Sequence, residues 1–296
     1  MRYSCLGLAS GIGAGNKSCG EGPLVLKECL HKLPLLWERM IIPDNTPMGD
    51  PCTQIALLST QLAKETLRLS QRKKFFLVFG GDHSSAIGTW SGIAEAYRLQ
   101  GEIGLIWVDA HMDAHTRETS PSGNIHGMPL ATLLGYGDAR LTSILSAHPK
   151  VKPENIALIG IRSYEPGEAQ LLQHLGVKIY YIDEVHQRGF SSVLAECIAK
   201  LQQQTVGYGI SFDWDVIDPA VVGAVGTPVP NGINAGEAME ALSILKAHAP
   251  LAVELVEYNP SLDPQKQTLA FVETFLATLL HQIGKHQTVL TRYANM

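Results

Sequence analysis

Several features are scarce in this chain of 296 residues, and each scarcity excludes a class of protein. No stretch approaches the roughly 20 apolar residues that a membrane-spanning helix needs, so we expect no membrane partner. Lys and Arg form no cluster and the formal net charge is −5, so we expect no nucleic-acid partner. Neither a Gly-x-Ser-x-Gly run nor a P-loop is present, which removes two common signatures of nucleophilic and nucleotide-dependent enzymes.

Cysteine is also sparse. The five cysteines are widely spaced and include no Cys-x-x-Cys pair, so we expect reduced thiols, with neither a disulfide framework nor a thiolate zinc site. This pattern favours a cytoplasmic protein. The chain also lacks a Pro/Ser/Gly-rich linker, an internal repeat and a low-complexity tract. We therefore expect residues 1–296 to form a single domain.

What the chain does contain is a series of apolar, β-rich runs that alternate with helical patterns. We expect strands at residues 3–8, 75–79, 103–108, 155–161, 177–182, 206–212 and 251–256. Helices are expected at residues 53–70 and 191–204 among others, the second with Ser191 as its cap. The strands are nearly continuous apolar runs, as is typical of strands buried on both faces. This pattern predicts an α/β fold with a mostly parallel sheet and helices on both sides.

Acidic side chains follow two of these runs. Asp109-Ala110-His111-Met112-Asp113 comes after residues 103–108, and Ser211-Phe212-Asp213-Trp214-Asp215 ends the run at residues 206–212. Side chains alternate along a strand, so the ligand-type groups of each run point the same way. These groups would repel and desolvate one another unless cations lay between them. The two runs therefore predict a metal site, and specifically a two-metal site.

Three further strand ends carry polar residues. They are the Gly80-Gly81-Asp82-His83 turn, residues 163–168 and Glu257. Sites in open parallel sheets form beyond the carboxyl ends of the strands, which makes His83 a further candidate ligand. Two His and four Asp, with no sulfur, favour Mn²⁺ over copper or structural zinc, while Fe, Co and Ni stay open. Four carboxylates nearly balance two divalent ions, so a bridging hydroxide can form near neutral pH.

Less specific interpretations compete for several residues. An isolated Asp-x-His-x-Asp can be a surface turn, and we interpret Asp218, before Pro219, as a structural Asx-type turn. Residues 11–15, Gly-Ile-Gly-Ala-Gly, hint at a dinucleotide loop but lack the third glycine, so we discount that function. The remaining histidines are interpreted as surface or capping residues; they include His31, His148, His174, His186, His248, His281 and His286.

The motifs in combination resemble the arginase/agmatinase ureohydrolase family, most closely arginase. The motifs are GGDHS, DAHxD and SFDxDxxDP, and the resemblance runs from Gly20-Glu21-Gly22-Pro23 to Glu257-Tyr258-Asn259-Pro260. It implies a three-layer α/β/α fold and a binuclear Mn²⁺ centre, two ions per chain, that hydrolyses guanidino or amidino groups. It also implies a homo-oligomer, because trimers and hexamers are common in the family.

The resemblance implies roles for the site residues. One metal is held by His83, Asp109, Asp113 and Asp213, and the other by His111, Asp109, Asp213 and Asp215, so that Asp109 and Asp213 bridge the ions. Asp113 also contacts the nucleophile and can pass a proton to the leaving amine. His126 matches the proton-shuttling histidine of the family. Glu257 matches the carboxylate that holds the guanidinium, and Thr227 matches the threonine of the same pocket.

The substrate end departs from the family at two positions. The loop Ser120–Gly127 is arginase-like, and Ser122, Asn124 and Glu168 fall where arginases contact the amino-acid end of the substrate. His115, however, stands where arginases usually have an Asn, and Glu165 where they have an Asp. A His can donate to a carboxylate and a Glu can accept from an ammonium, so arginine is the expected substrate. Trp214, bulkier than the usual small apolar residue, has no functional account from the sequence.

The expected reaction is hydrolysis of L-arginine to L-ornithine and urea by a metal-bridging hydroxide that attacks the guanidinium carbon. Two alternatives stay open. The first is a formimidoylglutamate, agmatine or other guanidino-acid hydrolase of the same family, which the two altered positions suggest. The second is an inactive homologue with a regulatory role, which the intact ligand set, His126 and Glu257 make less favoured.

Overall fold

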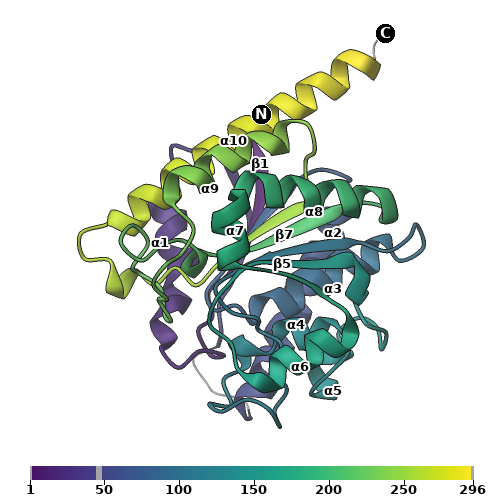
Figure 1. Cartoon of the computed structure of the whole chain (residues 1–296), viewed down its shortest axis with the longest axis vertical. Coiled ribbons are helices and arrows are strands. Elements are labelled where there is room, and N and C mark those ends of the chain that lie inside the picture. Colours follow the sequence, from purple (N-terminus) through teal and green to yellow (C-terminus); the bar gives the residue numbers. More distant parts are fainter. Residues whose placement is uncertain (1, 45–48, 295–296) are drawn as a thin grey trace.

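A parallel sheet between two layers of helices is the centre of the computed structural model, which describes residues 2–44 and 49–294 (Figure 1). Eight strands of the described residues form this sheet in the order β2-β1-β3-β8-β7-β4-β5-β6, and every neighbouring pair is parallel. The strands are β1 (Tyr3–Leu8), β2 (Leu35–Ile41), β3 (Phe76–Gly80), β4 (Gly104–Val108), β5 (Ile156–Ile161), β6 (Lys178–Tyr181), β7 (Tyr208–Asp213) and β8 (Ala252–Val256). The expected α/β/α architecture is confirmed.

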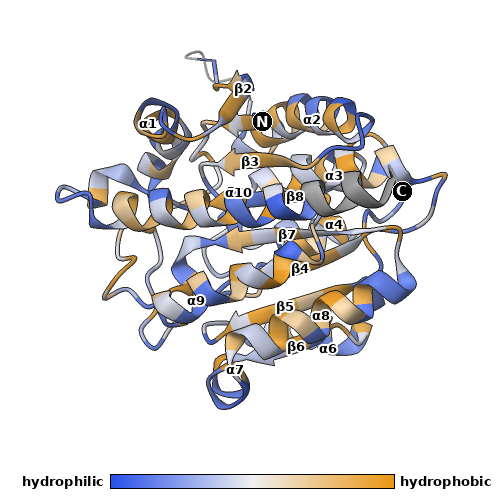
Figure 2. Ribbon diagram, turned by 90° about the horizontal axis from the view of Figure 1, so that it is seen from above, coloured by the Kyte–Doolittle hydropathy of each residue, from blue (hydrophilic) through white to orange (hydrophobic). Residues whose placement is uncertain are grey.

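Each face of the sheet has its own helical layer and its own hydrophobic core (Figure 1). One layer holds α1 (Gly22–Cys29), α7 (Ile182–Arg188), α8 (Phe190–Gln204), α9 (Ala235–Ala241) and α10 (Gln267–Ala294). The other holds α2 (Pro51–Ser70), α3 (Ser85–Tyr97), α4 (Pro129–Leu133), α5 (Ala139–Thr142) and α6 (Pro166–Leu175). The strands between the layers are largely hydrophobic along their length (Figure 2). Burial on both faces therefore accounts for the continuous apolar runs of the central strands.

Seven of the eight described strands coincide with the expected runs to within two residues at either end. The expectation missed β2, which is an edge strand. Glu38 and Arg39 interrupt its apolar residues, and most of its side chains are only half-buried or exposed. An edge strand needs one buried face at most, so it lacks the continuous apolar run by which the other strands are found.

Helix starts follow local capping chemistry. Helix α2 begins at Pro51, two residues before the expected start, because the Asp50 carboxylate accepts the backbone N–H groups of Cys52 (2.9 Å) and Thr53 (3.2 Å). The expectation that Ser191 caps α8 is wrong. That helix begins one residue earlier, and Gly189 precedes it as the cap with a positive φ of 82°.

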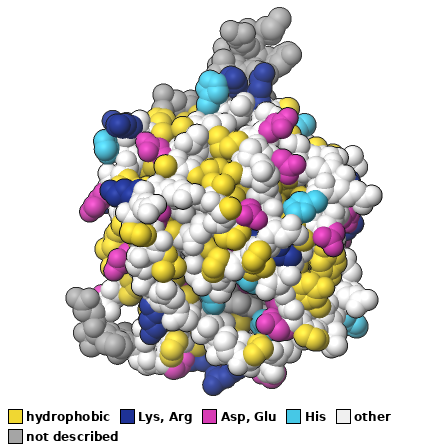
Figure 3. Space-filling model, turned by 60° about the vertical axis from the view of Figure 1, so that its left-hand side comes forward, with side chains coloured by type: hydrophobic (Ala, Val, Ile, Leu, Met, Phe, Trp, Pro, Cys, Tyr) yellow, Lys and Arg dark blue, Asp and Glu magenta, His cyan; other side chains and the backbone are white. Residues whose placement is uncertain are grey.

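The exterior carries mixed charge. On the face in Figure 3, Lys and Arg side chains are scattered among acidic ones over the described residues. Among the described residues, no helix has the length and apolar character needed to cross a membrane. The polar motifs of the sequence lie at the carboxyl ends of β3, β8, β7 and β4. These four strands are consecutive in the sheet.

Candidate metal centre

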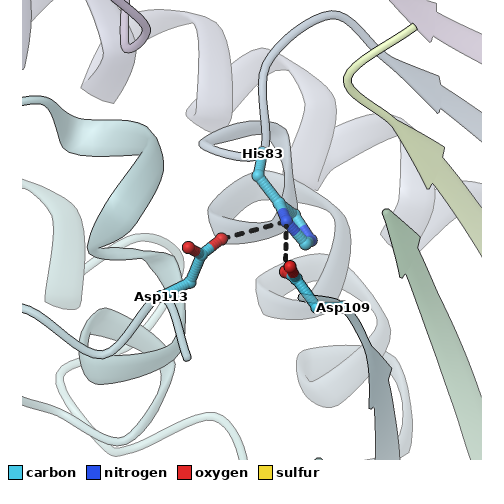
Figure 4. A group of neighbouring side chains, drawn as sticks. All are labelled: His83, Asp109 and Asp113. Carbon is cyan, nitrogen blue, oxygen red and sulfur yellow. Dashed lines mark ion pairs between the residues drawn. The ribbon is translucent and has the colours of Figure 1, made fainter. Parts of the chain in front are cut away.

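His83 lies at the centre of a group of carboxylates (Figure 4). Its Nδ1 atom is 3.0 Å from Asp113 Oδ2, 3.1 Å from Asp109 Oδ2 and 3.2 Å from Asp213 Oδ2. The His83 side chain is only 1% exposed. Although three oxygens are so close, Nδ1 makes no hydrogen bond with acceptable geometry among the described residues. A buried polar atom left in this state is costly, so the site favours a further partner between nitrogen and oxygens.

A second group of ligand-type atoms lies beside the first. His111 Nδ1 is 3.0 Å from Asp215 Oδ2 and 3.5 Å from Asp109 Oδ1. Asp109 therefore presents one oxygen to His83 and the other to His111, the arrangement expected of a bridging ligand. Asp213 presents Oδ2 to His83 and accepts the Asp215 backbone N–H with Oδ1. The structure thus brings all six expected ligands together, and the bridging role of Asp213 stays a prediction.

A hydrogen-bond relay orients the His83 ring. Its Nε2 atom lies 3.0 Å from Ser211 Oγ, and Ser211 in turn donates to Glu254 Oε2 at 2.9 Å. Because the serine proton is directed to Glu254, the serine oxygen accepts from Nε2–H of His83. In the neutral ring the other nitrogen, Nδ1, carries a lone pair that faces the three carboxylates. A nitrogen lone pair and three carboxylate oxygens that face one another can together coordinate a cation.

Burial and crowding disfavour negative charge on these aspartates. Burial, followed by the charge of Asp109, raises the pKa of Asp113 to about 6. Burial and the charges of Asp215 and Asp109 raise the pKa of Asp213 well above its ordinary value. Burial would also raise the pKa of Asp109, but the neighbouring imidazoles of His111 and His83 outweigh burial and lower it. Cations between the carboxylates would offset both the desolvation and the repulsion, so the donor set fits two divalent metal ions.

Two of the site residues have unusual backbone conformations. Asp113 has φ 49° and Glu257 has φ 68°, in the left-handed region that residues other than glycine seldom adopt. Such conformations cost of order 1–3 kcal/mol each and persist where the surroundings hold them. The surroundings are visible here: the Asp113 carbonyl accepts from Leu130 N–H (2.9 Å), and Glu257 N–H donates to the Gly81 carbonyl (2.9 Å).

His126 and Glu257 form a pair next to the metal ligands. His126 Nδ1 is 3.0 Å from Glu257 Oε1, which also accepts the His83 backbone N–H at 2.8 Å. Burial lowers the pKa of His126, but the hydrogen bond and charge of Glu257 outweigh it and raise the pKa to about 9. Glu257 Oε2 is buried without a hydrogen-bond partner among the described residues. This free acceptor suits a donor that arrives with a ligand.

The two departures from the family pattern contact each other. His115 Nε2 is 2.9 Å from Glu165 Oε2, and His115 Nδ1 is 3.1 Å from Thr119 Oγ1. Both ring nitrogens of His115 therefore have partners within the protein, and the expected substrate contacts of His115 and Glu165 stay predictions. The His115 side chain is 8% exposed and that of Glu165 54%. We call His115, Glu165, Glu168, Ser122 and Asn124, the residues expected at the amino-acid end of the substrate, the rim of the site. The rim is open to solvent at Glu165.

The other expected substrate residues lie at different depths. Ser122 is exposed and Asn124 is half-buried, and the Asn124 N–H donates to Ser122 Oγ at 3.2 Å. Glu168 is buried, and its two oxygens accept the backbone N–H groups of Glu165 and Ala114, both at 3.1 Å. It thus joins α6 to the loop after β4. Burial raises the pKa of Glu168 to about 8.

Thr227 lies against the metal ligands, since its Oγ1 donates to Asp215 Oδ2 at 3.3 Å. Asp218, expected to be structural, is confirmed in that role: its two oxygens accept the backbone N–H groups of Ala220 (3.0 Å) and Gly232 (3.1 Å). The segment from Asp218 to Gly232 is thereby held next to His111 and Asp215, the second group of ligand-type side chains.

Sequence reasoning missed two supporting residues, Glu254 and Arg162, and assigned no role to a third, Trp214. Glu254 is fully buried in β8 and accepts hydrogen bonds from the side chains of Ser85, Thr89, Trp90 and Ser211. A lone acidic residue inside an apolar run was the signal. Arg162 donates to the carbonyls of Asp215 (2.7 Å) and Val229 (2.8 Å), which holds the loop after β7. Trp214 packs edge-on against Phe275 of α10, with ring centroids 5.2 Å apart. Its bulk thus fixes the segment that carries Asp213 and Asp215 to that helix.

Comparison with known proteins agrees with this geometry. The Arginase family model matches residues 4–281. The chain is 43% identical to the arginase of Bacillus caldovelox over 226 residues, 76% of this chain and 75% of that one. It is also 43% identical to the arginase of Bacillus subtilis over 209 residues, 70% of this chain and 69% of that one. The crystal structure of arginase from Bacillus cereus superposes with a TM-score of 0.86 at 34% identity, over 94% of this chain and 97% of that chain.

Proposed function

The chain belongs to the arginase family, and from this membership we propose that it hydrolyses L-arginine to L-ornithine and urea. It is a hydrolase of the guanidino C–N bond with a binuclear metal centre. The observation that carries the proposal is the group of aspartates around the buried His83 and the half-buried His111, directly beside the His126–Glu257 pair. Ligands for cations and groups for proton transfer thus occur in one site.

The metal ions are Mn²⁺ in this proposal, two per chain. His83, Asp109, Asp113 and Asp213 would hold one, and His111, Asp109, Asp213 and Asp215 the other. Six side chains that offer carboxylate oxygens and imidazole nitrogens, with no sulfur, support the choice of Mn²⁺. When bound, the cations lower the pKa of water, so that a nucleophile is available near neutral pH.

Glu257 orients the guanidinium and the neighbouring residues manage protons. The free Oε2 of Glu257 accepts an N–H of the guanidinium, whose positive charge also offsets the buried carboxylate. Water oxygen forms a bond to the guanidinium carbon, and the bond from that carbon to the ornithine nitrogen breaks. Asp113 accepts a proton from the attacking water and passes it to the departing nitrogen, while His126 exchanges protons with solvent from a position that is 19% exposed.

The rim recognises the amino-acid end of the substrate. Ser122, Asn124 and Glu168 contact the amino-acid end, and Glu165 offers its carboxylate to the α-ammonium. His115 holds Glu165 through the 2.9 Å contact, so it contributes to recognition through that glutamate. Thr227 contributes to the guanidinium pocket from its position against Asp215.

Three wider proposals accompany this function. We propose that residues 1–296 form one domain, because all strands of the described residues join one sheet. We also propose a cytoplasmic location, supported by cysteines that are free in the structure, and a homo-oligomer, a trimer or hexamer. Light scattering of the purified protein tests the last of these.

The activity test is a substrate panel with Mn²⁺-loaded protein. Urea is measured from arginine and agmatine, and formamide from formimidoylglutamate. Arginine should have the highest kcat/KM, and agmatine, which lacks the carboxylate, should be poorer by about a hundredfold or more, because the polar groups of the rim stay unpaired. Agmatine equal to arginine would contradict the proposal. Formimidoylglutamate as the best substrate would favour the alternative suggested by His115 and Glu165.

A further inference from the structure

The centre of the glycine-rich loop after β1, residues 11–15, lies against the candidate catalytic histidine, His126. The Gly13 carbonyl accepts the backbone N–H of His126 at 3.1 Å. The Gly13 N–H donates to Asp82 Oδ2 at 2.8 Å. Gly13 is buried, so water does not compete for either bond. The loop therefore joins two segments that are distant in sequence.

Asp82 is the fixed end of this connection. It is 1% exposed, and its second oxygen, Oδ1, accepts the Ser84 backbone N–H at 2.9 Å. Asp82 also belongs to the turn that follows β3, next to His83. A continuous path thus runs from the end of β3 through Asp82 and Gly13 to His126, whose ring meets Glu257 at 3.0 Å.

The contact leaves no room for a side chain on Gly13. A Cβ atom there would lie 2.9 Å from Asp82 Oδ1, 3.0 Å from Ser84 Oγ and 3.1 Å from the His126 backbone nitrogen. All three distances are shorter than ordinary van der Waals contact, so at least one neighbour would have to move. A Cβ on Gly15 in the same loop would meet only the side-chain end of Asn124, at 3.3 Å.

We propose that Gly13 and Asp82 are positioning residues that set the place of His126 relative to Glu257. This inference rests on the proposed function, in which His126 exchanges protons during hydrolysis. Asp82 fixes the Gly13 amide, Gly13 holds the His126 backbone, and the His126 ring then reaches Glu257. The bare α-carbon of Gly13 allows the two backbones to approach closely enough for this.

The test combines Gly13→Ala with His126→Ala. In the parent, Gly13→Ala should lower kcat about tenfold, because a misplacement of a few tenths of an ångström already impairs proton transfer. In the His126→Ala background, the same substitution should change kcat by less than about twofold, since the group it positions is gone. Gly15→Ala is the matched control and should stay within about twofold of the parent. Metal content should remain two ions per chain in every variant.

An equal loss of kcat in both backgrounds would overturn the inference, as would a Gly13→Ala variant with parental kcat. Asp82→Asn, which keeps the side-chain volume but has only one oxygen acceptor, should show the same dependence on His126 if Gly13→Ala does not fold. Crystal structures provide a readout without activity: the His126–Glu257 hydrogen bond should be broken in Gly13→Ala and kept in Gly15→Ala. An intact bond in Gly13→Ala refutes the positioning role, whereas absent urea release in the parent refutes the proposed function alone.

Discussion

The metal pocket around His83 and the rim around His115 are built in opposite ways. Both centre on an imidazole that faces carboxylates, at 3.0–3.2 Å in the pocket and 2.9 Å in the rim. In the pocket, the aspartates come from β4, β7 and the segments that follow them, and none is more than 10% exposed. In the rim, Glu165 caps α6 and its side chain is 54% exposed.

This difference indicates that the pocket serves catalysis and the rim serves substrate recognition. Strand ends of a packed sheet can barely move, so the pocket can hold like charges together until cations arrive. A half-exposed glutamate on a helix cap adjusts at little cost, and its ion pair is screened by water. Changes in the pocket should therefore reduce kcat strongly, whereas changes in the rim should affect KM and substrate choice by smaller factors.

Metal removal should have the largest effect. Without cations the six ligands lack their partners and no nucleophile is generated at neutral pH, so chelation should lower the rate of urea release by at least about a thousandfold. Re-addition of Mn²⁺ should restore the rate. Elemental analysis of the active, purified protein should find two divalent ions per chain. At most one ion per chain in fully active protein would contradict the two-metal site.

Asp113→Asn should come next. By resemblance Asp113 binds metal and contacts the nucleophile, so the amide should lower kcat about a hundredfold to a thousandfold while the thermal unfolding curve stays cooperative. His126→Ala should cost less, about tenfold to a hundredfold, because water can partly replace a proton shuttle. Steady-state kinetics and metal analysis on both variants check this order. Parental turnover in both would show that the proton-transfer assignment is wrong.

The rim pair should show a smaller, coupled effect. Each of His115→Asn and Glu165→Asp alone breaks the 2.9 Å contact, and each should raise KM for arginine by less than about tenfold. The double variant, which has the residue types usual in arginases, should be better than the product of the two single effects. kcat/KM measured for the four proteins decides this. Multiplicative effects would show that His115 and Glu165 act independently.

The pH dependence of stability should be the smallest effect. His126 has a pKa of about 9 in the folded chain against about 6.5 for an unperturbed histidine, so folding favours its protonated form. The stabilisation is fully present below about pH 6.5 and is lost as pH rises through about 9. The Tm difference between the parent and His126→Ala should therefore be larger at pH 6 than at pH 10, at constant metal content. A constant difference would contradict the ion pair with Glu257.

The sequence by itself determined the metal pocket and the layered α/β fold. Asp109, His111 and Asp113 follow an apolar run, and their place just beyond the carboxyl end of β4 was enough to group them. The expected alternation along a strand does not apply to them, because β4 ends at Val108 and Asp113 has a left-handed backbone. Local pattern also located seven strands, because burial on both faces leaves a continuous apolar run. These properties depend on residues that are neighbours in the chain.

Only the tertiary structure decided which distant residues meet. His115 and Glu165 are 50 positions apart, and Gly13 and Asp82 are 69 apart, so no spacing in the chain predicts either contact. The edge strand β2 and the buried Glu254 also depend on the order of strands in the sheet, which places one at a solvent boundary and the other against α3. Long-range packing sets these pairings, because each depends on how several elements fill space together and on which polar groups must find partners.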